Sequence, residues 1–206
     1  MKLYYTPGAC SLSPHIVLLE AGYKFDIEKV DLKTKTTESG TDYNTISEKS
    51  YVPLLVLDNG EKLSEGAAIV QYLVDQKPET ELAPKAGSFE RVRLNELLSF
   101  ISSELHKSFG PFFAGLNEET LQFYRKRLEK SFKFISEKLQ GKKYLMGDRF
   151  SIADAYLFTV LNWTKPLNID LSPWPVLGEY MTRVAARPKV MEALKAEGLV
   201  PKDAAA

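Results

Sequence analysis

The chain has 206 residues, of which 44% are hydrophobic and 26% are charged, a mixture typical of globular proteins. This composition excludes a disordered, collagen-like or fibrous protein. The 27 Lys and Arg residues balance 27 Asp and Glu residues, and the formal net charge of +0 argues against wholesale electrostatic binding to nucleic acid or to an anionic membrane.

We expect a cytoplasmic protein without a membrane anchor or a metal site. The first residues are interrupted early by Pro7 and Gly8, unlike a signal peptide, and no run approaches the ~20 apolar residues that span a bilayer. The single cysteine, Cys10, cannot form an internal disulfide, and no Cys/His cluster has zinc-ligand spacing.

The first 80 residues alternate between strand and helix signals. Short apolar runs bounded by turn residues predict four strands, at 2–5, 25–30, 52–57 and 62–63. Helices are predicted at 11–22, capped by Ser11 or Ser13, and at 65–75, capped by Ser64. The polar stretch 31–50 is expected to be mostly loop. The order strand–helix–strand, then a strand hairpin, then a helix predicts a mixed four-stranded sheet.

After Pro78 the strand signals stop, and the fold class becomes α/β followed by all-α. Apolar residues recur with helical spacing, which predicts helices at 91–109, 118–139, 153–163, 175–186 and 188–196. Ser151 and Asp154 form a capping-box pattern, and we expect Asp154 to bond to the backbone at the helix start in a structural role.

Cys10 lies where the loop after the first strand meets the first helix, the position of the reactive thiol in thioredoxin-like domains. Unpaired N–H groups and the helix dipole at such a position favour a thiolate over a thiol. Ser13 stands where a dithiol protein has its second cysteine, so an activated Cys10 would bond to an external thiol. A small buried hydrophobic side chain is the alternative interpretation.

Two further motifs suit a peptide-like ligand. A cis Val52–Pro53 bond would turn the backbone polar groups of Val52 outward to pair with an extended peptide, whereas a trans proline at a strand start is the alternative. In Ser64-Glu65-Gly66, the N–H groups at a helix start can receive a carboxylate while Glu65 faces an amine, and an ordinary helix cap is the alternative.

His106 and Lys107 lie beside the apolar face of the helix predicted at 91–109. His106 could donate to a thiolate or act in acid–base catalysis, and a neighbouring Lys107 would favour the thiolate. In the alternative interpretation, both belong to a solvated helix surface.

Together these motifs resemble those of the cytosolic glutathione transferases, and specifically of the bacterial beta class. The resemblance covers about residues 1–200 and rests on the string Gly8–His15 around Cys10, on Val52-Pro53, on Glu65-Gly66 and on His106-Lys107. It implies a thioredoxin-like glutathione-binding domain at 1–80, an all-helical domain at 86–206 and a homodimer.

The resemblance also implies an enzyme of detoxification that uses glutathione as co-substrate, without a prosthetic group, and conjugates it to a hydrophobic electrophile. Cys10 would face the glutathione sulfur, form a mixed disulfide with it and support thiol–disulfide exchange, and His106 would be the second catalytic residue. The residues implied in glutathione binding are Lys35, Val52, Pro53, Glu65, Gly66, Ser99 and Lys107. The electrophile pocket is expected to include Tyr5, Phe112, Phe113, Tyr156, Trp163 and Thr164, although Tyr5 is not expected to activate the thiol.

Three positions depart from the family pattern. Gly66 stands where serine is usual and loses a hydroxyl hydrogen bond, Ser99 is shorter than the usual amide, and Tyr51 replaces a polar residue. Gly66 and Ser99 favour the alternative of a non-catalytic ligand- or partner-binding protein with the same fold. Retention of Cys10, Glu65 and His106-Lys107 favours the enzyme.

Overall fold

The computed structural model describes residues 1–200, which divide into two compact units. Within the described residues, the first unit contains 1–80 and 186–200, and the second contains 81–185. Buried apolar side chains occur in both units. The division into domains at 1–80 and 86–206 stays a prediction, and the packing itself groups the last helix with the first unit.

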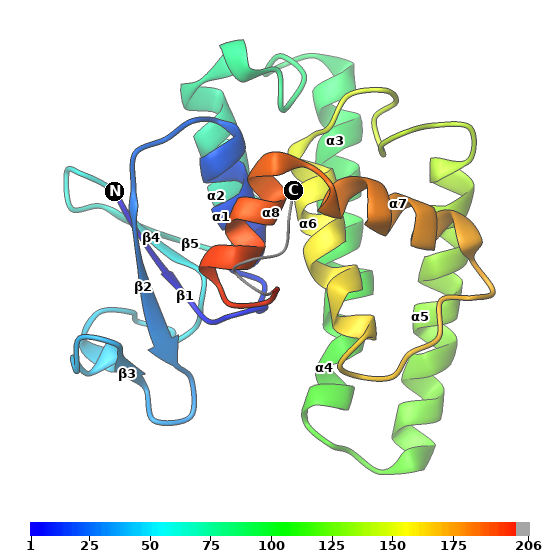
Figure 1. Ribbon diagram of the computed structural model, residues 1–206, viewed down its shortest axis with the longest axis horizontal. Coiled ribbons are helices and arrows are strands. Elements are labelled where there is room, and N and C mark those ends of the chain that lie inside the picture. The colour runs from blue at the N-terminus through cyan, green and yellow to red at the C-terminus, as the bar shows by residue number, and fades with distance from the viewer. Residues whose placement is uncertain (201–206) are drawn as a thin grey trace. The chain divides into compact units, whose positions relative to one another are not determined.

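The first unit is a mixed sheet with helices packed on it (Figure 1). Its strands and helices are β1 (Lys2–Tyr5), α1 (Leu12–Glu20), β2 (Asp26–Asp31), β3 (Thr36–Thr37), β4 (Leu54–Val56), β5 (Lys62–Ser64), α2 (Gly66–Gln76) and α8 (Pro188–Ala196). The strand order is β3-β2-β1-β4-β5. Only the β1–β2 pair is parallel, with Leu3 opposite Ile27, as the right-handed strand–helix–strand connection requires.

The mixed sheet is confirmed, but the prediction of four strands was wrong by one. The fifth strand, β3, is two residues long and lies in the polar stretch expected to be loop. It pairs with β2, placing Thr37 opposite Val30, and Thr37 is buried although it carries no apolar signal. A strand this short has no period-2 pattern to detect.

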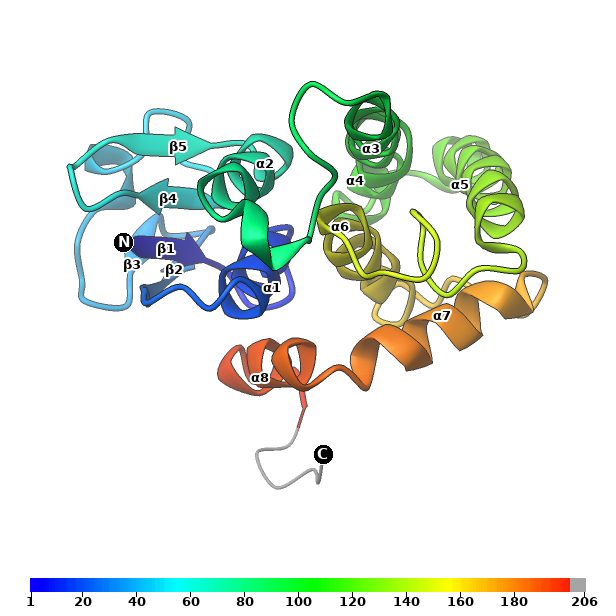
Figure 2. The same cartoon turned by 90° about the horizontal axis from the view of Figure 1, so that it is seen from above.

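Helices α1 and α2 pack side by side, and α8 packs against α1 (Figure 2). Helix α1 is apolar almost all round, as predicted, and it packs against both α2 and α8. Arg187, just before α8, binds Glu20 of α1 through two hydrogen bonds of 2.7 and 2.9 Å. Glu197, just after α8, binds Nδ1 of His15 at 2.9 Å.

Two predicted helix caps were wrong. Ser11 precedes α1, but its hydroxyl bonds to the backbone of Thr6 instead of capping the helix. Ser64 is the last residue of β5, and Glu65 takes the position before α2. Ser11 is held by the turn before α1, and Ser64 belongs to the strand β5. The local sequence pattern shows neither of these arrangements.

The second unit is entirely helical, as predicted. Its elements are α3 (Phe89–Phe100), a π-helical segment η3 (Ile101–His106), α4 (Lys107–Phe113), α5 (Glu118–Leu139), α6 (Ile152–Leu161), a short 3₁₀ turn η4 (Asn162–Thr164) and α7 (Pro175–Ala185). Every residue of α6 is buried, and this helix contacts α3, η3 and α7. It is therefore the central helix of the unit.

The capping box at α6 is confirmed. Asp154 accepts hydrogen bonds from the Ser151 N–H at 2.9 Å, from the Ser151 hydroxyl at 2.7 Å and from the Leu145 N–H at 2.9 Å. Burial raises the pKa of the Asp154 carboxyl to about 6, although these hydrogen bonds oppose the change. The carboxylate thus joins the start of α6 to the loop before it.

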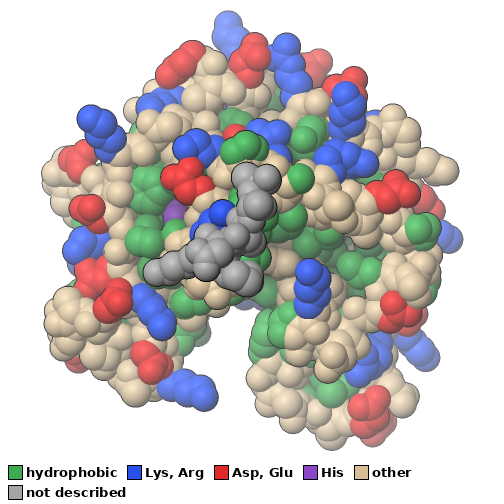
Figure 3. All heavy atoms as spheres, in the orientation of Figure 1, with side chains coloured by type: hydrophobic (Ala, Val, Ile, Leu, Met, Phe, Trp, Pro, Cys, Tyr) green, Lys and Arg blue, Asp and Glu red, His purple; other side chains and the backbone are tan. Residues whose placement is uncertain are grey.

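Charged side chains of both signs are interspersed over the face shown in Figure 3, outside the grey atoms. The pattern agrees with the balanced composition of the chain. Within residues 1–200, no helix is both long and apolar enough to cross a membrane.

Candidate active site

Cys10 lies in the turn between β1 and α1, and its side chain is partly exposed. Its thiol donates a hydrogen bond to the carbonyl oxygen of Val52, with Sγ 3.3 Å from that oxygen. The interpretation of Cys10 as a fully buried core residue is therefore wrong.

The turn that carries Cys10 is held at both ends. The Ala9 N–H donates to the Thr6 carbonyl at 3.0 Å, and the Thr6 N–H donates to the Ser11 hydroxyl at 3.2 Å. Gly8 has a φ of +71°, which favours glycine, and its N–H donates to Glu197 at 2.9 Å. These hydrogen bonds fix the backbone on both sides of Cys10.

The Val52–Pro53 peptide bond is cis, which excludes the alternative of a trans proline. The other residues of the first unit that are predicted to bind glutathione lie close to segment 49–53. Cys10 bonds to Val52, and Lys35 donates from Nζ to the Ser50 carbonyl at 2.9 Å. A Cβ placed on Gly66 would lie 3.8 Å from Cγ of Pro53.

Glu65 has an exposed side chain and a backbone φ of +70°, rare for a residue with a side chain. Its carboxylate binds Nζ of Lys49 at 2.7 Å. The next residue, Gly66, begins α2, so its N–H lies among the unpaired donors of a helix start. One edge of the first unit thus carries a thiol, a carboxylate and helix-start N–H groups.

In the second unit, η3 ends at His106, and the ring of His106 lies among aromatic side chains. Its Nδ1 is 2.8 Å from the hydroxyl of Tyr156, and its ring centroid is 4.8 Å from that of Trp163. Trp163 in turn packs edge-on against Phe113 at 5.4 Å. Four of the residues predicted for catalysis and for the electrophile pocket therefore form one cluster.

The remaining predicted residues differ in accessibility. Ser99 and Lys107 are exposed, whereas Thr164 is buried and donates its hydroxyl to the Leu161 carbonyl at 2.7 Å. Phe112 has the guanidinium of Arg125 over its ring at 5.3 Å. Tyr5 is buried, and burial raises the pKa of its phenol, which makes it a poor source of phenolate. The roles of all these residues stay predictions.

Sequence reasoning missed the residues that support the site from a distance. Lys49 binds Glu65, and Glu197 binds both His15 and the N–H of Gly8, two residues from Cys10. Glu197 is 189 positions away from Gly8 in the chain. A local sequence pattern cannot identify a hydrogen-bond partner at that separation.

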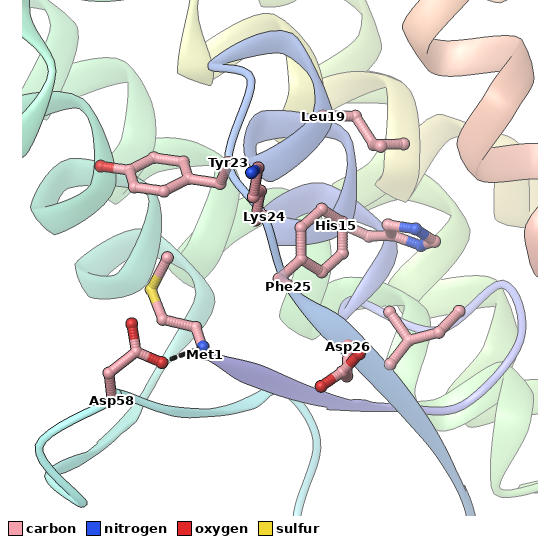
Figure 4. A pocket seen from close by; sticks show the side chains of 9 residues that line it. Met1, His15, Leu19, Tyr23, Lys24, Phe25, Asp26 and Asp58 are labelled. Carbon is pink, nitrogen blue, oxygen red and sulfur yellow. Dashed lines mark hydrogen bonds and ion pairs between the residues drawn. The ribbon is translucent and has the colours of Figure 1, made fainter.

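A cavity of about 680 Å³ lies elsewhere in the first unit (Figure 4). Met1, His15, Phe25, Asp26 and Asp58 are among its lining residues. Met1 and Asp26 stand at the amino end of β1, whereas Cys10 follows its carboxyl end. The cavity is therefore separate from the predicted glutathione site. Among residues 1–200, no group of three or more His, Cys, Asp or Glu side chains is arranged to hold a metal ion.

Comparison with known proteins gives the same family for both units. Residues 8–76 match the model of the glutathione S-transferase N-terminal domain, and residues 100–188 match that of the C-terminal domain. The chain is 44% identical to glutathione S-transferase GstA of Escherichia coli O157:H7, over 97% of this chain and all of that protein.

Two solved structures extend the likeness to the whole fold. The beta-class glutathione S-transferase of Sphingomonas chungbukensis matches with a TM-score of 0.93 and 47% identity, and a sphingomonad glutathione S-transferase complexed with glutathione matches with 0.92 and 44%. Each match covers 97% of this chain and all of the other. The chain therefore belongs to the glutathione S-transferase family and is an enzyme, a glutathione transferase, as opposed to a non-catalytic protein of the same fold.

Proposed function

We propose that the enzyme conjugates glutathione to hydrophobic electrophiles and that Cys10 adds thiol–disulfide exchange. The observation that carries this proposal is the partly exposed Cys10 thiol beside Val52, on the edge of the first unit that also presents Glu65 and Gly66. The sphingomonad relative, whose structure holds glutathione, supports the choice of ligand.

In this proposal glutathione binds along segment 49–53. The backbone of Val52 pairs with the cysteinyl residue, next to Pro53, and Glu65 with the N–H of Gly66 holds the γ-glutamyl head group. Lys35 reaches the glycyl carboxylate. Each pairing joins an opposite charge or a donor to an acceptor, as a peptide ligand with three charged ends requires.

For conjugation, the glutathione thiolate attacks the electrophilic carbon and the leaving group departs with its electron pair. Ser99, His106 and Lys107 come from the helical unit in this proposal, and His106 donates a hydrogen bond to the thiolate. The electrophile lies against the aromatic cluster of Phe113, Tyr156 and Trp163, since apolar side chains favour an apolar co-substrate.

For exchange, the Cys10 thiolate attacks one sulfur of glutathione disulfide. A Cys10–glutathione mixed disulfide forms, and one glutathione thiolate leaves. A second thiol then attacks the glutathione sulfur and releases Cys10. This chemistry needs a partly exposed thiol in the reducing cytoplasm, where we place the enzyme.

We also propose a homodimer, following the family resemblance. Phe89 and Val92 on α3 are 65% and 54% exposed and lie about one helical turn apart. Two exposed apolar side chains in this arrangement are suited to pack against a second copy of the chain. Sedimentation equilibrium measures the native mass and decides whether the enzyme is a dimer.

Cys10→Ala tests the roles of the thiol. We expect exchange with glutathione disulfide to fall at least a hundredfold, because no other cysteine exists in the chain. Mass spectrometry of the wild type incubated with glutathione disulfide should show one added glutathione, and the variant should show none. An aromatic halide assay measures conjugation in parallel, and loss of neither activity would refute a role for Cys10. A wild type that turns over neither substrate would refute the proposed reaction.

A further inference from the structure

In the second unit, the predicted catalytic residue His106 contacts an ionisable side chain, that of Tyr156. Nδ1 of His106 is 2.8 Å from the Tyr156 hydroxyl, and the two rings meet edge-on with centroids 5.9 Å apart. Tyr156 is 4% exposed and comes from the fully buried helix α6. The partner of His106 thus stands on a helix whose residues are all buried.

The surrounding structure restricts rotation of the His106 ring. The edge-on contact with Trp163 at 4.8 Å lies on one side, and Trp163 is itself packed against Phe109 at 5.6 Å. His106 is also the last residue of the π-helical segment η3, a type of irregularity frequent at functional sites. These contacts restrict the ring, and the nitrogen that meets Tyr156 is Nδ1.

We propose that Tyr156 is a positioning residue for His106, and that its hydroxyl donates to Nδ1 and keeps the ring proton on Nε2. The proposal rests on the proposed function of His106 as a donor to the glutathione thiolate. A neutral imidazole carries one N–H, and a thiolate can only accept. The tautomer that Tyr156 selects is therefore the one that presents a donor on the nitrogen away from Tyr156.

The direction of this hydrogen bond follows from the two groups. A phenol is a good donor and a modest acceptor, whereas the lone pair of an imidazole nitrogen is a good acceptor. The pair is therefore more stable with the phenol donating. Tyr156 was expected in the electrophile pocket on resemblance alone, and the hydrogen bond gives it a second task.

The other histidine, His15, provides a reference inside the same molecule. Its Nδ1 lies 2.9 Å from a carboxylate oxygen of Glu197, which can only accept when ionised. His15 must then carry a proton on Nδ1, the opposite of His106. Since the chain has two histidines, their ring nitrogens can be assigned with one variant of each.

The first test is ¹⁵N–¹H NMR of the full-length protein at pH 8, with His106→Gln for assignment. We expect the wild type to show the proton of His106 on Nε2 and that of His15 on Nδ1. In Tyr156→Phe the His106 signals should move toward a mixture of tautomers, while those of His15 stay unchanged. A proton on Nδ1 of His106 in the wild type, or the same tautomer in Tyr156→Phe, would overturn the proposal.

The second test is kinetic. We expect Tyr156→Phe to lower kcat for conjugation five- to twentyfold while the KM for glutathione changes less than twofold. Adding Tyr156→Phe to His106→Gln should cost nothing further, because the tyrosine acts through the histidine. Tyr144→Phe, a change to a buried tyrosine that packs edge-on against Phe150, is the matched control and should leave kcat unchanged.

The outcomes separate this inference from the function on which it rests. Additive losses in the double variant would mean that Tyr156 acts on its own and would overturn the positioning role. Full activity of His106→Gln would refute the proposed function of the histidine and the catalytic part of this inference. The NMR result would still decide whether Tyr156 sets the tautomer.

Discussion

At the scale of single residues, the family resemblance implies a serine at the position of Gly66, and this difference has a testable consequence. Gly66 begins α2 with an ordinary φ, and a Cβ there would make only a van der Waals contact with Pro53 at 3.8 Å. A side chain therefore fits without strain. The missing serine hydroxyl leaves the proposed γ-glutamyl site with one hydrogen bond fewer than the family pattern implies.

We predict that Gly66→Ser tightens glutathione binding about tenfold, since a hydrogen bond to a charged group contributes about 1.5–3 kcal/mol. Isothermal titration calorimetry measures the change in Kd. Gly66→Ala is the control, because it stiffens the helix start as serine does but adds no donor. Equal affinities of the Ser and Ala variants would contradict a hydroxyl contact and place the benefit in the backbone.

At the scale of elements, the helix predicted at 91–109 shows what a periodic apolar pattern can and cannot predict. The apolar spacing widens to four residues between Ile101, Leu105 and Phe109, all of which are fully buried. The structure accommodates this spacing by passing from α3 through the π-helical η3 into α4. The pattern predicted the helix and its buried face, but an unusual turn inside it is a response to packing partners from distant segments.

The same limit applies to the site. Cys10, Val52-Pro53 and Gly66 could be located from sequence because strand ends and helix starts are local signals, and the structure brings them together. The positive φ of Glu65 and its pairing with Lys49 could not be predicted from sequence, since both depend on how β5 and segment 49–53 meet. Long-range packing decides such details.

Asp154 gives a pH prediction for the element α6. Burial raises its pKa from the ordinary value of 3.8 to about 6, so the folded protein binds the proton more tightly than the unfolded chain. The stabilisation from this group is complete below pH 4 and is lost as the pH rises through 6. Through Asp154 alone, the free energy of unfolding should be about 1 kcal/mol higher at pH 5 than at pH 7.

Urea unfolding of wild type and Asp154→Asn at both pH values isolates this contribution, because other carboxyls titrate in both proteins. The variant should be less stable throughout, by about 2 kcal/mol or more, since its amide faces the donors of Ser151. The difference should grow from pH 7 to pH 5. Ser151→Ala, which leaves the carboxyl able to titrate, should retain the pH dependence of the wild type. A difference independent of pH would contradict the raised pKa.

At the scale of the whole molecule, the chain returns to its starting unit. After the helical unit, α8 packs on α1, and its flanking residues bind α1 and the Cys10 turn through Glu20, His15 and Gly8. The helix at 188–196 was predicted with correct bounds, but its place was not, because nothing in its own pattern indicates which surface covers its apolar face. Closure of the first unit by a distant segment makes its stability depend on the last helix.

The pair Arg187–Glu20 tests this dependence. The side chains of Arg187 and Glu20 are 28% and 10% exposed, and the guanidinium meets the carboxylate through two hydrogen bonds, so the pair should contribute more than an exposed ion pair. We predict a coupling energy of about 1–2 kcal/mol from the double-mutant cycle of Glu20→Gln and Arg187→Met, measured by urea unfolding. Arg187→Lys keeps the charge but loses the paired geometry, so it should fall between wild type and Arg187→Met. Additive single losses would show that α8 is held on α1 by its apolar face alone.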